Sequence, residues 1–494
     1  MTASKGGDGL VVVLNRRLAG VITHDFGRPR FTYADDYARE SGRLTPLSLS
    51  MPMRTGVTYP HQKTAPWLSG LLPEDNRVRE GWAAQYGVSA RNTSALLRHL
   101  GRDCAGAVQI APVEELADVL AQTGHTEPLS DADIADRLRT LIANPGRWPG
   151  AEERWSLAGM QAKFTAVRTS DGWATGHGNA ASTHIIKPGI TQFRGQALNE
   201  HLCQKALPAI GIAAAHTEYQ EFEGVPAIVV TRYDRVAQKD GTVVRLHQED
   251  MCQALSVWPS KKYAADGGPS AVTIAKLLAS HAEQRDVDRF TDMVVAQYLL
   301  GAPDGHAKNY SVILLGNRVT LAPVYDVASV LPYHPDPTSG LSRVAMPIAG
   351  KSKFGTVDLA AIAKFADKAG TDPDRLVERT REMAAALPDA IAAAAADIPA
   401  ETLGDLATAL QTGISQQCAT LDPPPRDATT VEPLDAVDDD EMLAEAADGE
   451  MPAEEEDAAG GDIPVVSYSR GKQAVRGHTR RRPTRRLSGI SEGS

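Results

Sequence analysis

Three polar residues in the C-terminal half of the chain have the types and spacing that phosphoryl transfer requires. Asp304 and Asn309 stand five positions apart, and Asp326 follows at the end of a predicted hairpin. Phosphoryl transfer needs a carboxylate that orients and deprotonates the attacking hydroxyl, and it needs oxygen ligands for magnesium. The pattern therefore predicts Asp304 as the catalytic base, with Asn309 and Asp326 as Mg²⁺ ligands. Because aspartate and asparagine also cap turns frequently, the spacing alone leaves a purely structural role open.

The segment around these residues supports the catalytic interpretation. The five-residue interval equals the separation of the catalytic aspartate and the metal-binding asparagine in protein-kinase catalytic loops. His306, inside the interval, can contact a phosphate or brace the loop through a hydrogen bond. The apolar run 311–315 and the turn residues 316–317 then predict a hairpin that returns the chain to the second carboxylate.

A second candidate segment precedes the apolar run 164–167. Small residues such as Ala158 and Gly159 let backbone amides approach phosphate oxygens, and Lys163 adds positive charge. The segment matches neither a Walker motif nor GxGxxG, so an ordinary turn into a strand would look the same.

Lys187 ends the apolar run 184–187, where an ammonium group can reach the α- and β-phosphates of a nucleotide. A solvated lysine at the edge of a sheet is the alternative. If Lys187 is buried, it requires an anionic partner, and we expect Glu200 in the helical segment 196–207 to supply it. The run 228–235 ends a further strand, whose backbone groups could face adenine.

The surrounding elements predict an α+β arrangement. Apolar runs at 164–167, 184–187 and 227–231 predict strands, whereas the patterns at 286–300 and 376–396 predict helices. Strands that precede helices favour a nucleotide site between a sheet-rich lobe and a helical lobe. Glycine and proline at 145–150 predict a junction after a small N-terminal α+β unit that runs from Leu10–Leu14 into a helical stretch at 77–100.

Length and composition limit the class of protein. The chain has 494 residues, of which 42% are hydrophobic, which is enough for more than one core. It has neither a leader-like N-terminus nor an apolar run of about 18 residues, so we expect a cytoplasmic protein with no membrane contact. Four cysteines without CxxC spacing signal neither a disulfide framework nor a cysteine zinc site.

Charge is segregated at the C-terminal end. Residues 432–462 carry fourteen acids and no lysine or arginine, and residues 470–486 carry eight basic residues and no acid. This composition predicts a disordered tail from 421 to 494. Its basic end could contact an anionic surface, or its two blocks could simply attract each other and keep the chain soluble.

Taken in order, these segments resemble the HipA family of toxin–antitoxin serine/threonine kinases, over about residues 10–415. The motifs that carry the resemblance are Leu47–Pro52, Gly70–Glu74, Gly101–Ala107, Ser156–Lys163, Arg245–Leu255, Asp304–Asn309 and Ala322–Asp326. The resemblance implies a two-lobed α+β kinase-like fold related to the phosphatidylinositol 3/4-kinases. It divides the chain into an N-terminal subdomain (1–120), a sheet-rich ATP-binding part (121–260), a helical catalytic lobe (261–420) and the tail.

The resemblance also implies roles for individual residues, with ATP and Mg²⁺ as cofactors. Asp304 is the implied catalytic base, Lys187 pairs with phosphate, and Ser156 matches the serine at which the family autophosphorylates. The implied nucleotide-binding residues are Ala158, Gly159, Met160, Gln161, Ala162, Lys163, Lys187, Thr231, Arg232, Tyr233, His306, Ala307, Lys308 and Asn309. The implied metal ligands are Asn309 and Asp326. The chain departs from the family pattern at Met160 and Ala162, where relatives carry Ala and Glu.

The family implies partners as well. These are a HipB-like helix-turn-helix antitoxin, operator DNA contacted only through that antitoxin, and a translation protein such as an aminoacyl-tRNA synthetase as substrate. A catalytically weak, nucleotide-binding corepressor that acts with the antitoxin is the alternative function. Transfer of AMP in place of phosphate is a third possibility.

Overall fold

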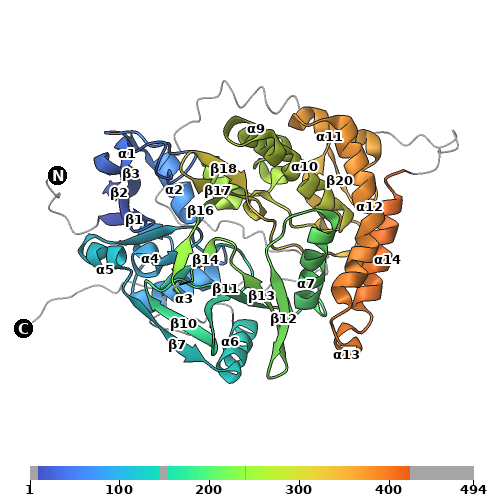
Figure 1. Ribbon diagram of the computed structural model, residues 1–494, viewed down its shortest axis with the longest axis horizontal. Helices are drawn as coiled ribbons and strands as arrows, with labels where there is room; N and C mark the ends of the chain where they lie inside the picture. Colours follow the sequence, from blue (N-terminus) through green and yellow to red (C-terminus); the bar gives the residue numbers. More distant parts are fainter. Residues whose placement is uncertain (1–8, 145–153, 240, 423–494) are drawn as a thin grey trace, which may run out of the picture. The chain divides into compact units, whose positions relative to one another are not determined.

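The computed structural model describes residues 9–144, 154–239 and 241–422 (Figure 1). The predicted junction at 145–150 lies outside the described residues, and so does the charged tail from 423 onward. The predicted strands and helices named above are confirmed, with ends that differ by a few residues, except that the helical stretch predicted at 77–100 is two helices, Asn76–Tyr86 and Thr93–Leu100.

The N-terminal unit is built on a five-stranded antiparallel sheet in the order β4-β3-β2-β1-β6. Strand β1, which lies between β2 and the edge strand β6, is buried on both faces because every residue of the run is aliphatic. The strands are β1 (Leu10–Leu14), β2 (Arg17–Asp25), β3 (Arg28–Tyr33), β4 (Thr58–Tyr59) and β6 (Val108–Pro112). The helices are α1 (Asp35–Arg39), α2 (His61–Ser69), α3 (Asn76–Tyr86), α4 (Thr93–Leu100) and α5 (Leu116–Ala121).

A second antiparallel sheet has six strands in the order β12-β13-β11-β9-β10-β7. Its strands are β7 (Gly124–Leu129), β9 (Phe164–Thr169), β10 (Gly172–Gly178), β11 (His184–Pro188), β12 (Thr217–Phe222) and β13 (Val225–Thr231). Helix α6 (Asp131–Ala143) begins with a capping box between Ser130 and Asp133 and contacts β11, β12 and β13. A short parallel pair, β5 (Asp103–Cys104) with β8 (Trp155–Ser156), joins this region to the N-terminal unit.

Helices dominate the rest of the described chain. They are α7 (Gln196–Ala206), α8 (Met251–Ala254), α9 (Ala271–His281), α10 (Gln284–Leu299), α11 (Leu359–Ala369), α12 (Pro373–Ala395), α13 (Ala400–Leu403) and α14 (Leu406–Ala419). The strands among them are β14 (Arg235–Ala237), β15 (Val243–Arg245), β16 (His247–Asp250), β17 (Ser311–Leu315), β18 (Arg318–Leu321), β19 (Arg343–Ile348) and β20 (Lys351–Lys353). Figure 1 shows α12 and α14 side by side, with α7 next to them. Within the described ranges, every helix is too short or too polar to cross a membrane.

The motif at 245–255 joins the N-terminal unit to the helical part. His247 Nε2 lies 2.9 Å from the carbonyl oxygen of Leu47, and the Gln253 amide donates to the Trp67 carbonyl at 3.0 Å. Between them, the buried Glu249 accepts a 2.7 Å hydrogen bond from the backbone N–H of Leu49. Side chains of this motif therefore bond to backbone groups about 200 positions away, which fixes the N-terminal unit against the core.

Replacing Glu249 by Gln should remove a pH dependence of stability. Burial raises the pKa of Glu249 to about 8, whereas a glutamate in an unfolded chain titrates near pH ~4.3. Between these values the folded state holds a proton that the unfolded state has lost, so the free energy of unfolding falls as pH rises through this window. We expect the free energy of unfolding of Glu249→Gln, relative to that of the wild type, to increase by at least about 1 kcal/mol between pH 5 and pH 8. Denaturant unfolding at the two pH values measures this difference. Glu80→Gln, at an exposed site on α3, is the control and should show no such gain.

Candidate active site

A buried ion cluster centres on Lys187, the penultimate residue of β11. Its ammonium group lies 2.5 Å from Glu200 Oε1 on α7 and 2.8 Å from Asp326 Oδ1. The side chains of Lys187 and Glu200 are only 6% and 1% exposed. Lys187 is thus buried, and the expected partnership with Glu200 is confirmed.

The charges in this cluster shift one another's pKa values. Burial alone would lower the pKa of Lys187, but the carboxylates of Asp326 and Glu200 outweigh it and raise that pKa above its ordinary value. Burial would likewise raise the pKa of Asp326, yet Lys187 and Lys163 hold it below the ordinary range. For Glu200 the effect of burial outweighs that of Lys187, and the pKa of Glu200 is raised. The two acids shift in opposite directions because Asp326 faces the charge of Lys163 as well as that of Lys187, whereas the neighbouring Asp326 adds to the effect of burial on Glu200.

Backbone contacts hold Asp326 beside β11. Val324, two residues before Asp326, exchanges hydrogen bonds with the chain before β12, through Ala215 N to Val324 O and Val324 N to Ala213 O, both 2.9 Å. Asp326 itself has a φ of +62°, a left-handed conformation that aspartate tolerates better than most side chains. The hydroxyl of Tyr325 donates to the carbonyl of Lys308 at 2.7 Å, which connects this turn to the loop that contains Asp304.

Asp304 is braced from three sides. The hydroxyl of Tyr263 donates to Asp304 Oδ1 at 2.7 Å, and His306 Nε2 lies 3.8 Å from the same oxygen. The side-chain amide of Asn309 donates to the Asp304 carbonyl at 2.7 Å. Desolvation by surrounding protein raises the pKa of Asp304 to about 6, although 55% of the side chain is exposed. The carboxylate is therefore ionised at neutral pH but basic enough to accept a proton.

The other residues of the Asp304 loop face inward. Burial lowers the pKa of His306 well below its ordinary value, so this imidazole is neutral. Ala307 donates its N–H to the Lys262 carbonyl at 3.2 Å. The ammonium group of Lys308 lies 2.5 Å from Asp250 and is buried. The Lys308 side chain thus points toward the 245–255 motif and not toward Asp304. Its role in nucleotide binding remains a prediction.

The loop from Ala158 to Lys163 connects β8 to β9. Lys163 folds back on it, donating to the Ala158 carbonyl at 2.9 Å, and burial lowers the pKa of Lys163 to about 8. Gly159 has a φ of +110°, and a Cβ there would lie 2.5 Å from Lys163 Nζ, so only glycine fits. Met160 is 56% exposed, and Gln161 donates to the Pro188 carbonyl at 2.8 Å beside the Lys187 strand. The loop, which also contains the half-buried Ala162, therefore lies next to the ion cluster.

Ser156 is fully buried just before this loop. Its hydroxyl donates to the Leu71 carbonyl at 2.7 Å, and β8 pairs with β5. Gly159 continues the attachment by accepting a hydrogen bond from Glu74 N at 3.2 Å. The N-terminal unit therefore holds the segment that starts at Ser156.

The predicted adenine-facing residues follow β13. Thr231, the last residue of β13, pairs with His184 of β11, the strand of Lys187. The Arg232 side chain is buried and binds Asp234 and Asp103, so it braces the segment and does not face outward. The Tyr233 hydroxyl donates to Gln248, and its ring lies 6.0 Å from that of Tyr325. The structure places Thr231 and Tyr233 near the cluster and gives Arg232 a structural contact.

Three residues beside Asp304 were missed by the sequence reasoning. Tyr263 contacts the carboxylate directly, and the neighbouring Lys262 forms a 2.7 Å ion pair with Glu74 of the N-terminal unit. No spacing pattern links Tyr263 or Lys262 with the loop forty positions later, so only their types offered a signal. Glu74 lies in the motif Gly70–Glu74, for which the sequence indicated no role.

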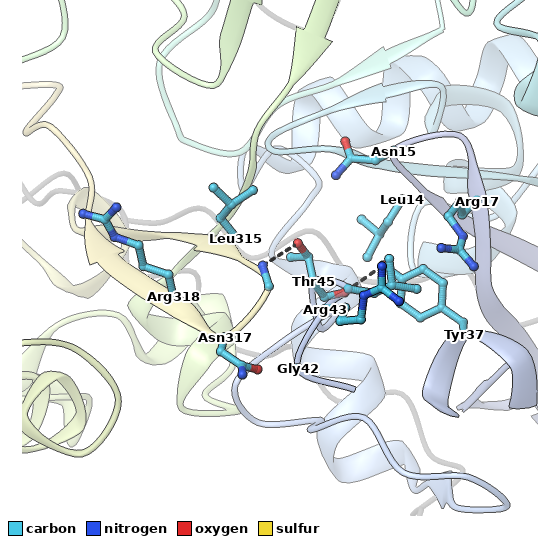
Figure 2. Close-up of a pocket in the computed structure, with 12 residues that line it drawn as sticks. Leu14, Asn15, Arg17, Tyr37, Gly42, Arg43, Thr45, Leu315, Asn317 and Arg318 are labelled. Atoms are coloured by element: carbon cyan, nitrogen blue, oxygen red, sulfur yellow. Dashed lines mark hydrogen bonds between the residues drawn. The ribbon is translucent and has the colours of Figure 1, made fainter. Parts of the chain in front are cut away.

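The hollow drawn in Figure 2 lies elsewhere, between the N-terminal unit and the β17–β18 turn. Gly316 N donates to Thr45 Oγ1 across it at 3.1 Å. Its lining residues are Leu14, Asn15, Arg17, Tyr37, Gly42, Arg43, Leu44, Thr45, Leu315, Gly316, Asn317 and Arg318. None of them is a predicted site residue, so this hollow is not the candidate active site. The candidate active site is identified by the charges and hydrogen bonds around Asp304 and Lys187.

The oxygen donors fit a magnesium ion. Because the Asn309 amide nitrogen is used by the Asp304 carbonyl, the amide oxygen is left as the atom for a cation. Asp326 is ionised and partly exposed. One carboxylate and one amide oxygen, completed by phosphate and water, are the hard ligands that Mg²⁺ prefers.

Known proteins resemble this chain over most of its described length. Sequence models for the HipA N-terminal domain and the HipA-like C-terminal domain match residues 10–111 and 155–391. The chain is 36% identical over 360 residues to the putative kinase Y4mE of Sinorhizobium fredii, covering 72% of this chain and 84% of that protein. It is 29% identical over 365 residues to the serine/threonine-protein kinase toxin HipA of Shewanella oneidensis, covering 70% and 80%.

A solved structure shows the same fold. The complex of Shewanella oneidensis HipA with HipB and operator DNA contains a chain that matches with a TM-score of 0.72 at 26% identity, over 83% of this chain and 97% of that one. The expected fold is confirmed as a mixed α/β, kinase-like fold similar to HipA. The relation to phosphatidylinositol 3/4-kinases, the lobe boundaries and the residue roles remain predictions.

Removing the Lys187 charge should destabilise the fold, because Glu200 would be left buried without a cation. We expect Lys187→Met to cost about 3 to 5 kcal/mol in the free energy of unfolding. The double variant Lys187→Met/Glu200→Gln should recover at least about 1 kcal/mol of that loss, since it no longer buries an unpaired acid. Denaturant unfolding of the wild type, both single variants and the double variant measures the coupling. Strictly additive losses would show that the two side chains do not interact.

Proposed function

This chain belongs to the HipA family, and from that premise we propose that it transfers the γ-phosphoryl group of ATP to a serine or threonine hydroxyl of another protein. The observation that carries the proposal is the Asp304 carboxylate, which accepts a hydrogen bond from Tyr263 and has a raised pKa, in a loop where Asn309 holds the Asp304 backbone carbonyl. A carboxylate near neutral pKa is suited to accept the proton of an attacking hydroxyl.

The remaining residues position the nucleotide. Lys187, fixed by Glu200, presents its charge to the α- and β-phosphates, while the loop 158–163 with Lys163 covers the phosphates. Thr231 and Tyr233 border the adenine. Asn309 and Asp326 hold Mg²⁺, which when bound neutralises charge on the phosphate oxygens.

Ser156 is the proposed site of autophosphorylation. A phosphate there cannot keep the donor bond to Leu71 and adds about two negative charges to a fully buried position. The segment would have to leave β5, and the loop 158–163 that begins beside it would lose its place near Lys187. This gives self-inactivation a physical route.

The partners are proposed by analogy with the relatives. The Shewanella oneidensis protein is a toxin, and its solved structure contains HipB and operator DNA. We propose for this chain a helix-turn-helix antitoxin of the HipB kind, with DNA contacted through it. The proposed substrate is a translation protein such as an aminoacyl-tRNA synthetase.

Replacing Asp304 by Asn should abolish phosphoryl transfer, because the amide cannot accept the hydroxyl proton. With magnesium and γ-labelled ATP, wild type should acquire label at Ser156, and Asp304→Asn should label at least about 100-fold more slowly. Asp374→Asn, an exposed aspartate in the first turn of α12, is the matched control and should label at the wild-type rate. EDTA should stop labelling of both the wild type and the Asp374→Asn control.

Two other results would contradict the proposal. Label from α-labelled ATP would reveal transfer of AMP, and equal labelling of wild type and Asp304→Asn would remove Asp304 from the chemistry. Ser156→Ala separates self-modification from activity, because it should lose its own label but still phosphorylate a protein acceptor.

A further inference from the structure

Two histidines and a glutamate converge at the edge of the six-stranded sheet, on strands β7 and β10. His125 of β7 stands directly opposite His177 of β10 in the antiparallel register. Glu127 lies two positions after His125, so the strand period places it on the same face. The two imidazole rings stack with centroids 5.0 Å apart and an interplanar angle of 15°.

The potential ligand atoms have the separation that a metal ion requires. One atom from each side chain lies within 4.8 Å of the others. Glu127 Oε1 is 3.5 Å from His125 Nε2, and Glu127 Oε2 is 3.4 Å from His177 Nε2. Ligands bound at about 2.0 to 2.1 Å in a tetrahedral zinc site are about 3.4 Å apart. Two imidazoles and a carboxylate are also a known donor set for zinc with one open position.

His177 is poorly satisfied without an ion. Its side chain is only 12% exposed, and neither ring nitrogen has a hydrogen-bond partner among the described residues. Burying a polar atom without a partner costs free energy. A salt bridge from Glu127 to two protonated histidines is the alternative, but it would place two positive rings 5.0 Å apart, where they repel. One divalent ion would bind one ligand atom of each of the three side chains, including one of the two ring nitrogens of His177.

We propose that His125, Glu127 and His177 bind a divalent transition-metal ion of the zinc class, with water in the fourth position, and that the ion fastens β7 to the sheet. Strand β7 needs such a link because it is an edge strand and is almost entirely exposed, with only Leu129 partly buried. This site differs in kind from the proposed magnesium site, whose ligands are oxygen atoms alone. It does not depend on the proposed kinase function.

Zinc uptake by the full-length, chelator-treated protein tests the site. Titration calorimetry with ZnCl₂ in excess Mg²⁺ should show one site in the wild type that is lost in His177→Ala. His125→Ala and Glu127→Gln, at side chains that are 65% and 62% exposed, should bind at least roughly tenfold more weakly without risk to folding. His281→Ala, an exposed histidine at the end of α9, is the matched control and should bind as wild type does.

Two further readouts decide the outcome. A zinc concentration that saturates the wild type should raise its melting temperature by a few degrees and should raise that of Glu127→Gln by less. Cobalt should give the visible bands of a tetrahedral site in wild type and His281→Ala only. Equal zinc uptake by wild type, His125→Ala and Glu127→Gln, or no uptake by any of them, would overturn the proposal.

Discussion

A buried ammonium group that must be neutralised organises the candidate site. Lys187, near the end of β11, lies inside the protein. An uncompensated charge there would cost several kcal/mol, so Glu200 and Asp326 have to reach it. These acids come from a helix and from a turn 139 positions away. Satisfying one lysine therefore fixes how the six-stranded sheet, α7 and the turn after β18 meet.

The same constraint extends to Asp304. The turn that carries Asp326 bonds to the Asp304 loop through Tyr325 and Lys308, and Asp326 contributes to the raised pKa of Asp304. Lys308 is occupied by Asp250, which belongs to the motif that fastens the N-terminal unit. A change at Asp326 would therefore alter the pKa of the Asp304 carboxylate.

A second buried network ties the N-terminal unit to the segment after β13. Asp103 binds Arg232 and Arg235, and its pKa is held below its ordinary range because these guanidinium groups outweigh burial. Together with the Ser156–Leu71 and Glu74–Lys262 contacts, this network makes the N-terminal unit part of the site's support. The recognised motifs of that unit thus have a mechanical explanation in the structure.

The sequence by itself determined most of the elements and predicted the chemistry. Local periodicity and turn residues decide strands such as β1 and the β17–β18 hairpin, because these depend on near neighbours. The types and spacing of Asp304 and Asn309, and the need of a buried Lys187 for Glu200, were also legible from the chain. Only the tertiary structure decided that Tyr263 braces Asp304, that Arg232 and Lys308 are used in buried ion pairs, and that His125, Glu127 and His177 meet. Those contacts join residues far apart in the sequence, and their partners are selected by packing and charge compensation, which no local pattern encodes.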